Sequence, residues 1–293
     1  MGYGGERVVR RKEIDGSSSV PCFYGKELRY KREQAGLSLE AFLEGSYYGK
    51  SYLSDIEHGQ RRMPIALARH ADQRLGTDGF FERNCKDVQK ARKDGHAEYF
   101  VDVLELEEQA VEIEEWEPLL IPGPLQLEPY MRALILAAYP RESEEVLAAR
   151  VAARRARAWL FEDRDSPESW VVLHESVLWQ PVLPPDEMAE QLAHVVEVMR
   201  KRRAFPQLVP QKSGPHPFMM GMSRFLAFND APPVMYTEGM YHGQLIDEPG
   251  LVRQYSKAYG RLRAAALDPE TSLRLIEQAA EDYRNGKQPR PLE

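Results

Sequence analysis

Three glycines divide the segment from residue 25 to residue 79 and limit it to a bundle of short helices. Gly36, Gly59 and Gly76 each follow a helix-favouring run. Glycine commonly ends a helix because it adopts the left-handed conformation without strain. Ser38 is placed to cap one helix, and Pro64 fits the first turn of another. Helices are therefore expected at about residues 26–35, after Ser38, at 50–58 and at 65–75, with a polar break at 46–49.

Length and charge indicate two parts with different tasks. A chain of 293 residues fits about two domains, and 43% hydrophobic residues can build their cores. The net charge of −7 argues against a protein that binds nucleic acid over its whole surface. Lys and Arg outnumber Asp and Glu by 13 to 10 over residues 1–76, whereas residues 98–117 hold nine acids and no Lys or Arg. The acidic stretch therefore marks a boundary.

Four segments are expected along the chain. Residues 1–24 read as a flexible arm and 25–79 as a helical domain. Residues 80–104 read as a helical connector that breaks at Gly95, and residues 105–293 as a second domain. The apolar runs are shorter than the roughly 20 residues that span a membrane. Cys22 and Cys85 show neither a disulfide framework nor metal-ligand spacing. We therefore expect a cytoplasmic protein without membrane contact.

The second half mixes helical and extended patterns. Apolar and β-branched runs bounded by Gly and Pro indicate short strands. These patterns predict an α+β domain with a small antiparallel sheet. The expected helices are 130–138, 142–161, 188–202, 251–266 and 269–284, and the expected strands are 170–173, 207–209, 218–228 and 234–236.

The first domain resembles a known DNA-binding fold. Residues 25–79 are similar to the Xre/Cro-type helix-turn-helix of phage-repressor-like regulators, which implies a mainly α, lambda-repressor-like domain that binds double-stranded DNA. The matching pieces are Leu28-Arg29, Arg32-Glu33, Ala35-Gly36-Leu37-Ser38, Tyr52-Leu53-Ser54, Ile56-Glu57 and Gly59. The departures from the family pattern are Lys31, Leu39, Leu43, Tyr47 and Asp55, of which Tyr47 replaces a turn glycine.

In such a domain the start of the second helix of the motif lies nearest the base edges. Lys50, Ser51 and Tyr52 take that place here, and Asp55 could accept a hydrogen bond from cytosine. Arg61 and Arg62 follow in a loop suited to phosphate contacts. Ser38, at the cap, completes the predicted DNA-binding set. A homodimer would present two such helices about 34 Å apart.

The second half is similar to the C-terminal domain of unknown function in WhiJ-type actinobacterial regulators. This resemblance implies a regulator that works with a small partner protein encoded nearby, in an antitoxin-like arrangement. Its main pieces are residues 116–123, 149–154, 175–178, 214–217 and 262–267. The chain departs from the family after Gly221, where Met222-Ser223-Arg224-Phe225 replaces the usual Pro-Phe.

No catalytic motif is evident in the second half. His174, Glu175 and Ser176 have the residue types of a hydrolase triad, but adjacent residues do not supply its geometry. The seven histidines show no paired ligand spacing. We therefore expect no enzyme activity, cofactor or metal. Aromatic and polar residues here could instead line an effector pocket, although such aromatics are more often core. The candidate pocket residues are Trp116, Glu175, His216, Tyr236 and Glu238.

The leading hypothesis is a sequence-specific DNA-binding regulator, controlled through its second domain by a partner protein or a small effector. One alternative is a recruited family member in which the helix-turn-helix is a scaffold and the second domain binds or transforms a small molecule, for example in a biosynthetic pathway. Leu39, Tyr47 and Asp55 motivate this alternative. A third is an antitoxin-like protein that binds only other proteins.

Overall fold

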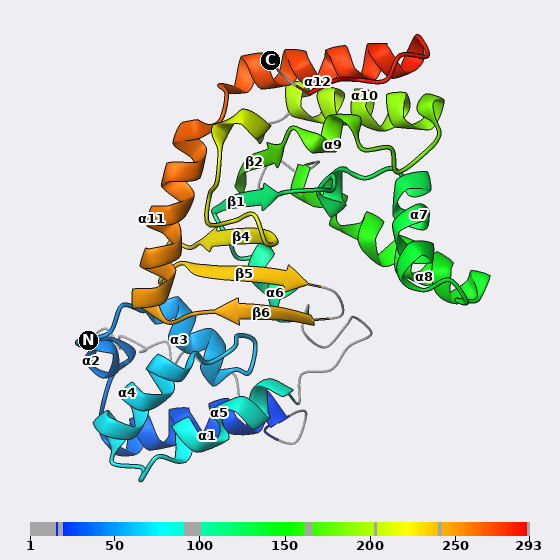
Figure 1. Cartoon of the computed structure of the whole chain (residues 1–293). Helices are drawn as coiled ribbons and strands as arrows, with labels where there is room; N and C mark the ends of the chain where they lie inside the picture. The colour runs from blue at the N-terminus through cyan, green and yellow to red at the C-terminus, as the bar shows by residue number, and fades with distance from the viewer. Residues whose placement is uncertain are drawn as a thin grey trace, which may run out of the picture. The chain divides into compact units, whose positions relative to one another are not determined.

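Two compact units make up the chain, Met1–Val101 and Asp102–Glu293 (Figure 1). The computed structural model describes residues 16, 20–90, 101–161, 166–201, 204–239 and 242–291. Most of the expected arm and the expected break at Gly95 lie outside these residues. Within them, no helix is long and apolar enough to cross a membrane.

The first unit is helical, as the glycine pattern predicts. Its first helix begins at Val20, so the expected arm is wrong for residues 20–24. Pro21 lies in the first turn of that helix, where its fixed backbone angle suits helical geometry. The fourth helix starts and ends where expected, and Gly76 closes it with a φ of +63°. The helices are α1 (Val20–Gln34), α2 (Leu39–Leu43), α3 (Lys50–Glu57), α4 (Ile65–Leu75) and α5 (Phe80–Lys90).

Close contact between α1 and α3 fixes the core of this unit. A Cβ atom at Gly25 of α1 would lie 2.2 Å from the carbonyl oxygen of Ile56 in α3. Only glycine fits so near the neighbouring backbone. Beside this contact, Leu28, Leu53 and Leu67 are completely buried.

Helix α5, which was expected to belong to the connector, packs into the first unit. The Asp72 carboxylate accepts hydrogen bonds from the backbone N–H groups of Phe81 and Glu82, at 2.9 and 2.7 Å. The Tyr24 hydroxyl donates to the Phe81 carbonyl at 2.5 Å. These bonds tie α5 to α4 and α1.

The second unit is a mixed sheet with helices on both faces. The elements up to the second strand are α6 (Val101–Glu107), β1 (Glu112–Glu117), η1 (Gly123–Leu125), α7 (Glu128–Ala138), α8 (Glu144–Arg155), η2 (Ala156–Phe161) and β2 (Glu168–His174). The remainder are α9 (Ser176–Trp179), α10 (Pro185–Lys201), β3 (Ala204–Val209), η3 (Gln211–Ser213), β4 (Met222–Ala227), β5 (Val234–Gly239), β6 (His242–Ile246), α11 (Pro249–Ala265) and α12 (Pro269–Arg284).

The sheet has six strands in the order β3-β2-β1-β4-β5-β6. Strands β1, β2 and β3 are parallel, while β4, β5 and β6 add to them in antiparallel fashion. The α+β class is confirmed, but the expectation of a small antiparallel sheet is wrong in both size and direction. The central strand that the sequence analysis did not predict is β1, whose sequence Glu-Ile-Glu-Glu-Trp-Glu lies within the acidic stretch. Its charges are matched by arginines from distant segments, which a local pattern does not reveal.

Side chains alternate between the two faces of this sheet. One face, here called the α10 face, carries Ile113, Val171 and Leu226 and packs against α10 and α12. The opposite face, here called the α11 face, carries Trp116 and Phe225 and packs against α11.

The outer edge of β3 is covered by the segment that leads into α12. The backbone N–H of Leu208 donates to the Ser272 hydroxyl at 2.9 Å. The carbonyl of Leu208 accepts from the N–H of Leu267 at 2.8 Å. Helix α12 and its lead-in thus replace a seventh strand at this edge.

Candidate functional sites

The α2–α3 pair of the first unit is held by caps and by α4. The Ser38 hydroxyl accepts from the N–H of Ala41 at 3.1 Å, which caps α2. The guanidinium of Arg74 donates to the Ala41 carbonyl at 2.9 Å. In the turn, Gly45 has a φ of +84°. The left-handed turn residue is therefore Gly45, which explains how the chain accommodates Tyr47.

A buried ion pair fixes α3 against α1. Arg32 donates from Nε and Nη2 to the Glu57 carboxylate, at 2.6 and 2.9 Å. Its Nη1 donates to the Leu37 carbonyl at 2.7 Å. The two charged side chains are only 8% and 4% exposed. The hydrogen bond to Glu57 raises the pKa of the Arg32 guanidinium. Glu57 is therefore a structural partner and not a solvated acid.

The predicted DNA-binding residues divide into two groups. Lys50 and Ser51 are exposed at the start of α3, and the Lys50 ammonium pairs with Glu40 at 2.5 Å. Tyr52 is only 5% exposed. The first two residues of α3 are therefore accessible to a ligand, and the third is buried.

Tyr52, Asp55 and Arg61 engage one another. The Arg61 guanidinium lies 4.7 Å from the centre of the Tyr52 ring, and its Nε lies 3.5 Å from the Asp55 carboxylate. The Tyr52 hydroxyl donates to the Arg62 carbonyl at 3.2 Å. These residues order the loop after α3, and the Arg61 side chain is only 9% exposed.

Tyr47 is an accessible residue that the sequence analysis did not select. It is 82% exposed, in the turn just before α3. In the sequence it stands out only as a replaced glycine. The sequence feature that could have identified it is an aromatic residue within a polar break between two helices.

In the second unit, four of the five candidate pocket residues lie near or beyond the ends of strands, whereas Tyr236 lies within β5, and the five are spread over both faces of the sheet. Trp116 and His216 meet on the α11 face, with ring centres 5.0 Å apart. Tyr236 and Glu238 lie on the other face, where the tyrosine hydroxyl donates to the carboxylate at 3.1 Å. Glu175 is buried directly after β2. The structure therefore joins four of the five residues in two pairs on opposite faces, and Glu175 belongs to neither pair.

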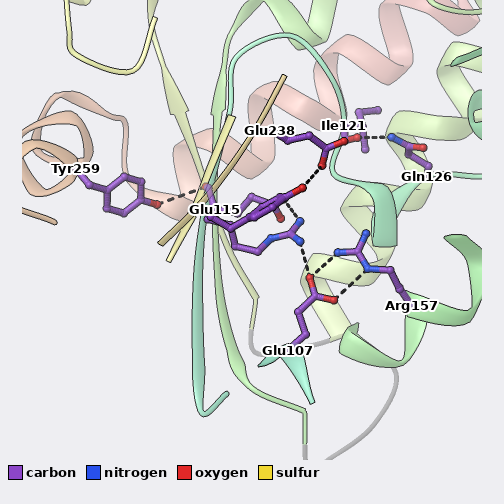
Figure 2. Close-up of polar contacts among 9 residues, drawn as sticks. Glu107, Glu115, Ile121, Gln126, Arg157, Glu238 and Tyr259 are labelled. Atoms are coloured by element: carbon purple, nitrogen blue, oxygen red, sulfur yellow. Dashed lines mark hydrogen bonds and ion pairs between the residues drawn. The ribbon is translucent and has the colours of Figure 1, made fainter. Parts of the chain in front are cut away.

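A charge network covers the α10 face beside Tyr236. Register aligns Glu115, Arg224 and Tyr236 across β1, β4 and β5. Arg224 pairs with Glu115 and, at 2.5 Å, with Glu107 of α6. Arg157 pairs with the same Glu107 through two bonds of 2.6 and 3.1 Å (Figure 2). The network joins α6 and η2 to the sheet.

Glu117 extends this network at the end of β1. Burial raises the pKa of its carboxyl well above the usual value, and the charge of Glu115 raises it further, although part of its surface reaches solvent. Arg224 acts in the opposite direction and Glu238 adds to the rise. The charged residues that interact here are Glu107, Glu115, Glu117 and Glu238 against Arg157 and Arg224.

On the α11 face, His174 and Ser176 contact each other where β2 ends. The His174 Nδ1 lies 2.7 Å from the Ser176 hydroxyl and accepts from the Ser176 N–H at 3.2 Å. The same hydroxyl lies 3.1 Å from the Pro118 carbonyl. This contact is local to one turn, and the expectation that these residues form no catalytic triad stays a prediction.

Comparisons with known proteins place the second unit in a family. The model of a domain of unknown function, DUF5753, matches residues 100–278, which contain the whole six-stranded sheet. No curated protein and no solved structure matches the chain. On this match, the chain belongs to the DUF5753 family.

Proposed function

We propose that the protein is a regulator that binds double-stranded DNA as a homodimer through α3 and is controlled through its DUF5753 unit. The observation that carries this proposal is the placement of α3. Its inner side is fixed by Arg32 and by the buried Leu53, while Lys50 and Ser51 at its start are exposed. A rigid helix with an accessible N-terminal end is what major-groove reading requires. The Xre/Cro-type resemblance of residues 25–79 supports the same proposal.

Within this proposal we assign the roles of the predicted residues according to their exposure and contacts. Lys50 and Ser51 remain the candidates for base contacts. Tyr47, exposed just before them, is added as a candidate phosphate contact through its hydroxyl. Tyr52 and Arg61 are assigned to positioning the loop after α3, because they pack on each other.

Control is proposed to act through α6. This short helix begins at Val101, at the boundary of the two units, and ends at Glu107. Arg157 and Arg224 hold Glu107 on the sheet. A small effector or a partner protein that changes the network would alter how firmly α6 is held. The site of action is proposed to be the cytoplasm.

The test is DNA binding by the full chain. A random duplex library is selected on the protein, and the selected sequence is compared with a scrambled one by fluorescence anisotropy at two salt concentrations. Lys50→Ala should weaken selective binding about 5- to 150-fold, which corresponds to the 1–3 kcal/mol of one good contact. Lys86→Ala, which removes an exposed lysine from α5, is the matched control and should change little. Failure to select or bind any duplex at low salt would overturn the proposal.

A second candidate function is favoured by one feature of the same surface. Lys50 is neutralised by Glu40, and Arg61 is occupied by Asp55 and Tyr52. These pairings reduce the positive charge available to phosphates. In this second proposal the first unit is a scaffold, and the DUF5753 unit binds or transforms a small molecule.

A further inference from the structure

Loops from the three parallel strands meet around Trp116 on the α11 face. Trp116 is near the end of β1, Ser176 follows β2, and His216 lies in the loop after β3. Open sheets with parallel strands bind ligands outside the carboxyl ends of those strands, where the strand order changes. Strand β1 has a parallel neighbour on one side and an antiparallel neighbour on the other. Trp116 therefore lies at the carboxyl end of the parallel part of the sheet, which is the end where such sheets bind ligands.

Two histidines pack against this tryptophan. The ring centres of His216 and His174 lie 5.0 and 6.4 Å from that of Trp116, nearly perpendicular to it. The Trp116 indole N–H donates to the Phe218 carbonyl at 2.7 Å, which fixes the loop that carries His216. The Nδ1 atom of His216 is buried and has no hydrogen-bond partner within the described residues. A buried nitrogen without a partner requires an explanation, and a ligand that donates or accepts a hydrogen bond there is one.

The Nδ1 atom of His174 is engaged by Ser176. It lies 2.7 Å from the Ser176 hydroxyl and 3.2 Å from the Ser176 backbone nitrogen. Burial lowers the pKa of His174, and the charge of Glu175 opposes this change. Burial also lowers the pKa of His216, and the charge of His174 lowers it further. An anion beside both rings would reverse these effects, because it favours the protonated forms.

Three exposed apolar side chains lie in the loops that carry these contacts. Leu119, Met219 and Met220 are 53%, 62% and 99% exposed. The Met219 N–H bonds to the His216 carbonyl at 3.4 Å. Leu119 follows Pro118, whose carbonyl contacts the Ser176 hydroxyl. Exposed apolar side chains beside convergent polar groups are typical of small-molecule sites.

We propose that this place, here called the Trp116 site, binds a small organic acid with an apolar chain. The carboxylate lies between His174 and His216, and the chain covers Leu119, Met219 and Met220. Binding takes up a proton, because the bound carboxylate favours the imidazolium form. This inference is independent of whether the first unit binds DNA.

Octanoate is the probe, and the full-length protein is titrated with it at pH 6 and pH 8. Calorimetry in buffers of different ionisation enthalpy measures proton uptake, and the histidine Hε1 signals are followed by NMR. Affinity should be higher at pH 6, by up to about tenfold per pH unit between the pKa of the free imidazole and the higher pKa of the bound one. Octan-1-ol has the apolar chain without the charge, and inorganic phosphate has the charge without the chain. Each should bind at least about tenfold more weakly than octanoate, a difference near 1.4 kcal/mol.

Three variants assign the site. His216→Gln should weaken octanoate binding about tenfold or more, while His242→Gln, on the exposed start of β6, should leave it unchanged. Met220→Ser should weaken octanoate but not phosphate, and its exposure excludes an effect through folding. The proposal is overturned if octanoate fails to bind, if octan-1-ol binds equally well, or if neither His216→Gln nor Met220→Ser changes octanoate affinity.

Discussion

Breaking the ion pair between Arg32 and Glu57 should destabilise the first unit strongly. Both side chains are more than nine-tenths buried, so removing one partner leaves a buried charge without its counter-charge. Breaking such a pair costs about 3–5 kcal/mol. Glu57→Gln should lower the free energy of unfolding by about 3 kcal/mol, the lower end of this range, because the Leu37 carbonyl and the glutamine amide oxygen still accept hydrogen bonds from Arg32. Replacing both partners, in Arg32→Met with Glu57→Leu, should cost roughly 3 kcal/mol less than the sum of the single changes.

The assay uses the distribution of tryptophans. All four lie at positions 116, 159, 170 and 179, within the second unit, so their fluorescence reports that unit alone. Far-UV circular dichroism also reports the helices of the first unit. Unfolding of the first unit in urea is therefore followed by circular dichroism, and unfolding of the second unit by tryptophan fluorescence. A loss of 3 kcal/mol moves the urea midpoint by about 1–3 M at the usual slopes. The fluorescence transition should not move.

Two outcomes would refute this reasoning. If Glu57→Gln costs less than about 0.5 kcal/mol, the pair behaves like an exposed salt bridge. If the double replacement costs the sum of the single ones, the two charges do not interact in the folded unit.

Three further changes test other parts of the fold. Glu117→Gln removes a carboxyl whose pKa in the folded chain is raised above 4.5, so the wild-type stability that is present below pH 4.5 declines as pH rises through the folded-state pKa. The advantage of Glu117→Gln over wild type in fluorescence-monitored urea unfolding should therefore grow from pH 5.5 to pH 7.5, and a constant difference would contradict it. Gly25→Ala should cost about 3 kcal/mol, since its Cβ meets the Ile56 carbonyl, whereas Gly260→Ala, in open space on α11, should stabilise by about 0.5–1 kcal/mol; thermal unfolding compares the two. Ser38→Ala removes the cap of α2 and should cost about 1 kcal/mol by circular dichroism, and no loss would show that the cap is replaced.

Local signals were sufficient to predict most helices. Helix α4 matches its expected residues because Pro64, the apolar spacing and Gly76 act within one short segment. The start of α1 was placed too late, since the Ser-rich residues before it outweighed Pro21 as a helix signal. Helix boundaries of this kind depend on a few neighbours and are accessible from sequence.

Strand β1 shows what the sequence does not reveal. Four of its six residues are glutamate, which disfavours a central strand on propensity alone. Its place depends on Arg224 and Arg263, which lie more than 100 positions away and pair with Glu115 and Glu114. The short β6, with the sequence His-Gly-Gln-Leu-Ile, has no alternating apolar pattern and was not predicted either.

The candidate sites were predictable to a similar degree. The start of α3 at Lys50 follows from the local pattern, and so does its exposure. The burial of Tyr52 and Arg61 does not, because it depends on how the following loop folds back. In the second unit, aromatic residues indicated a pocket. The strand register, which the sequence does not give, places Trp116 and Tyr236 on opposite faces of the sheet.

The covering of β3 by Ser272 and Leu267 has a consequence for shortened chains. A chain that stopped before Leu267 would leave both the N–H and the carbonyl of Leu208 at an open sheet edge. Open edges recruit strands from other molecules. Removing Leu267 together with α12 should therefore allow the domain to self-associate by pairing its β3 strands. This truncation should cause aggregation before any loss of secondary structure is detected.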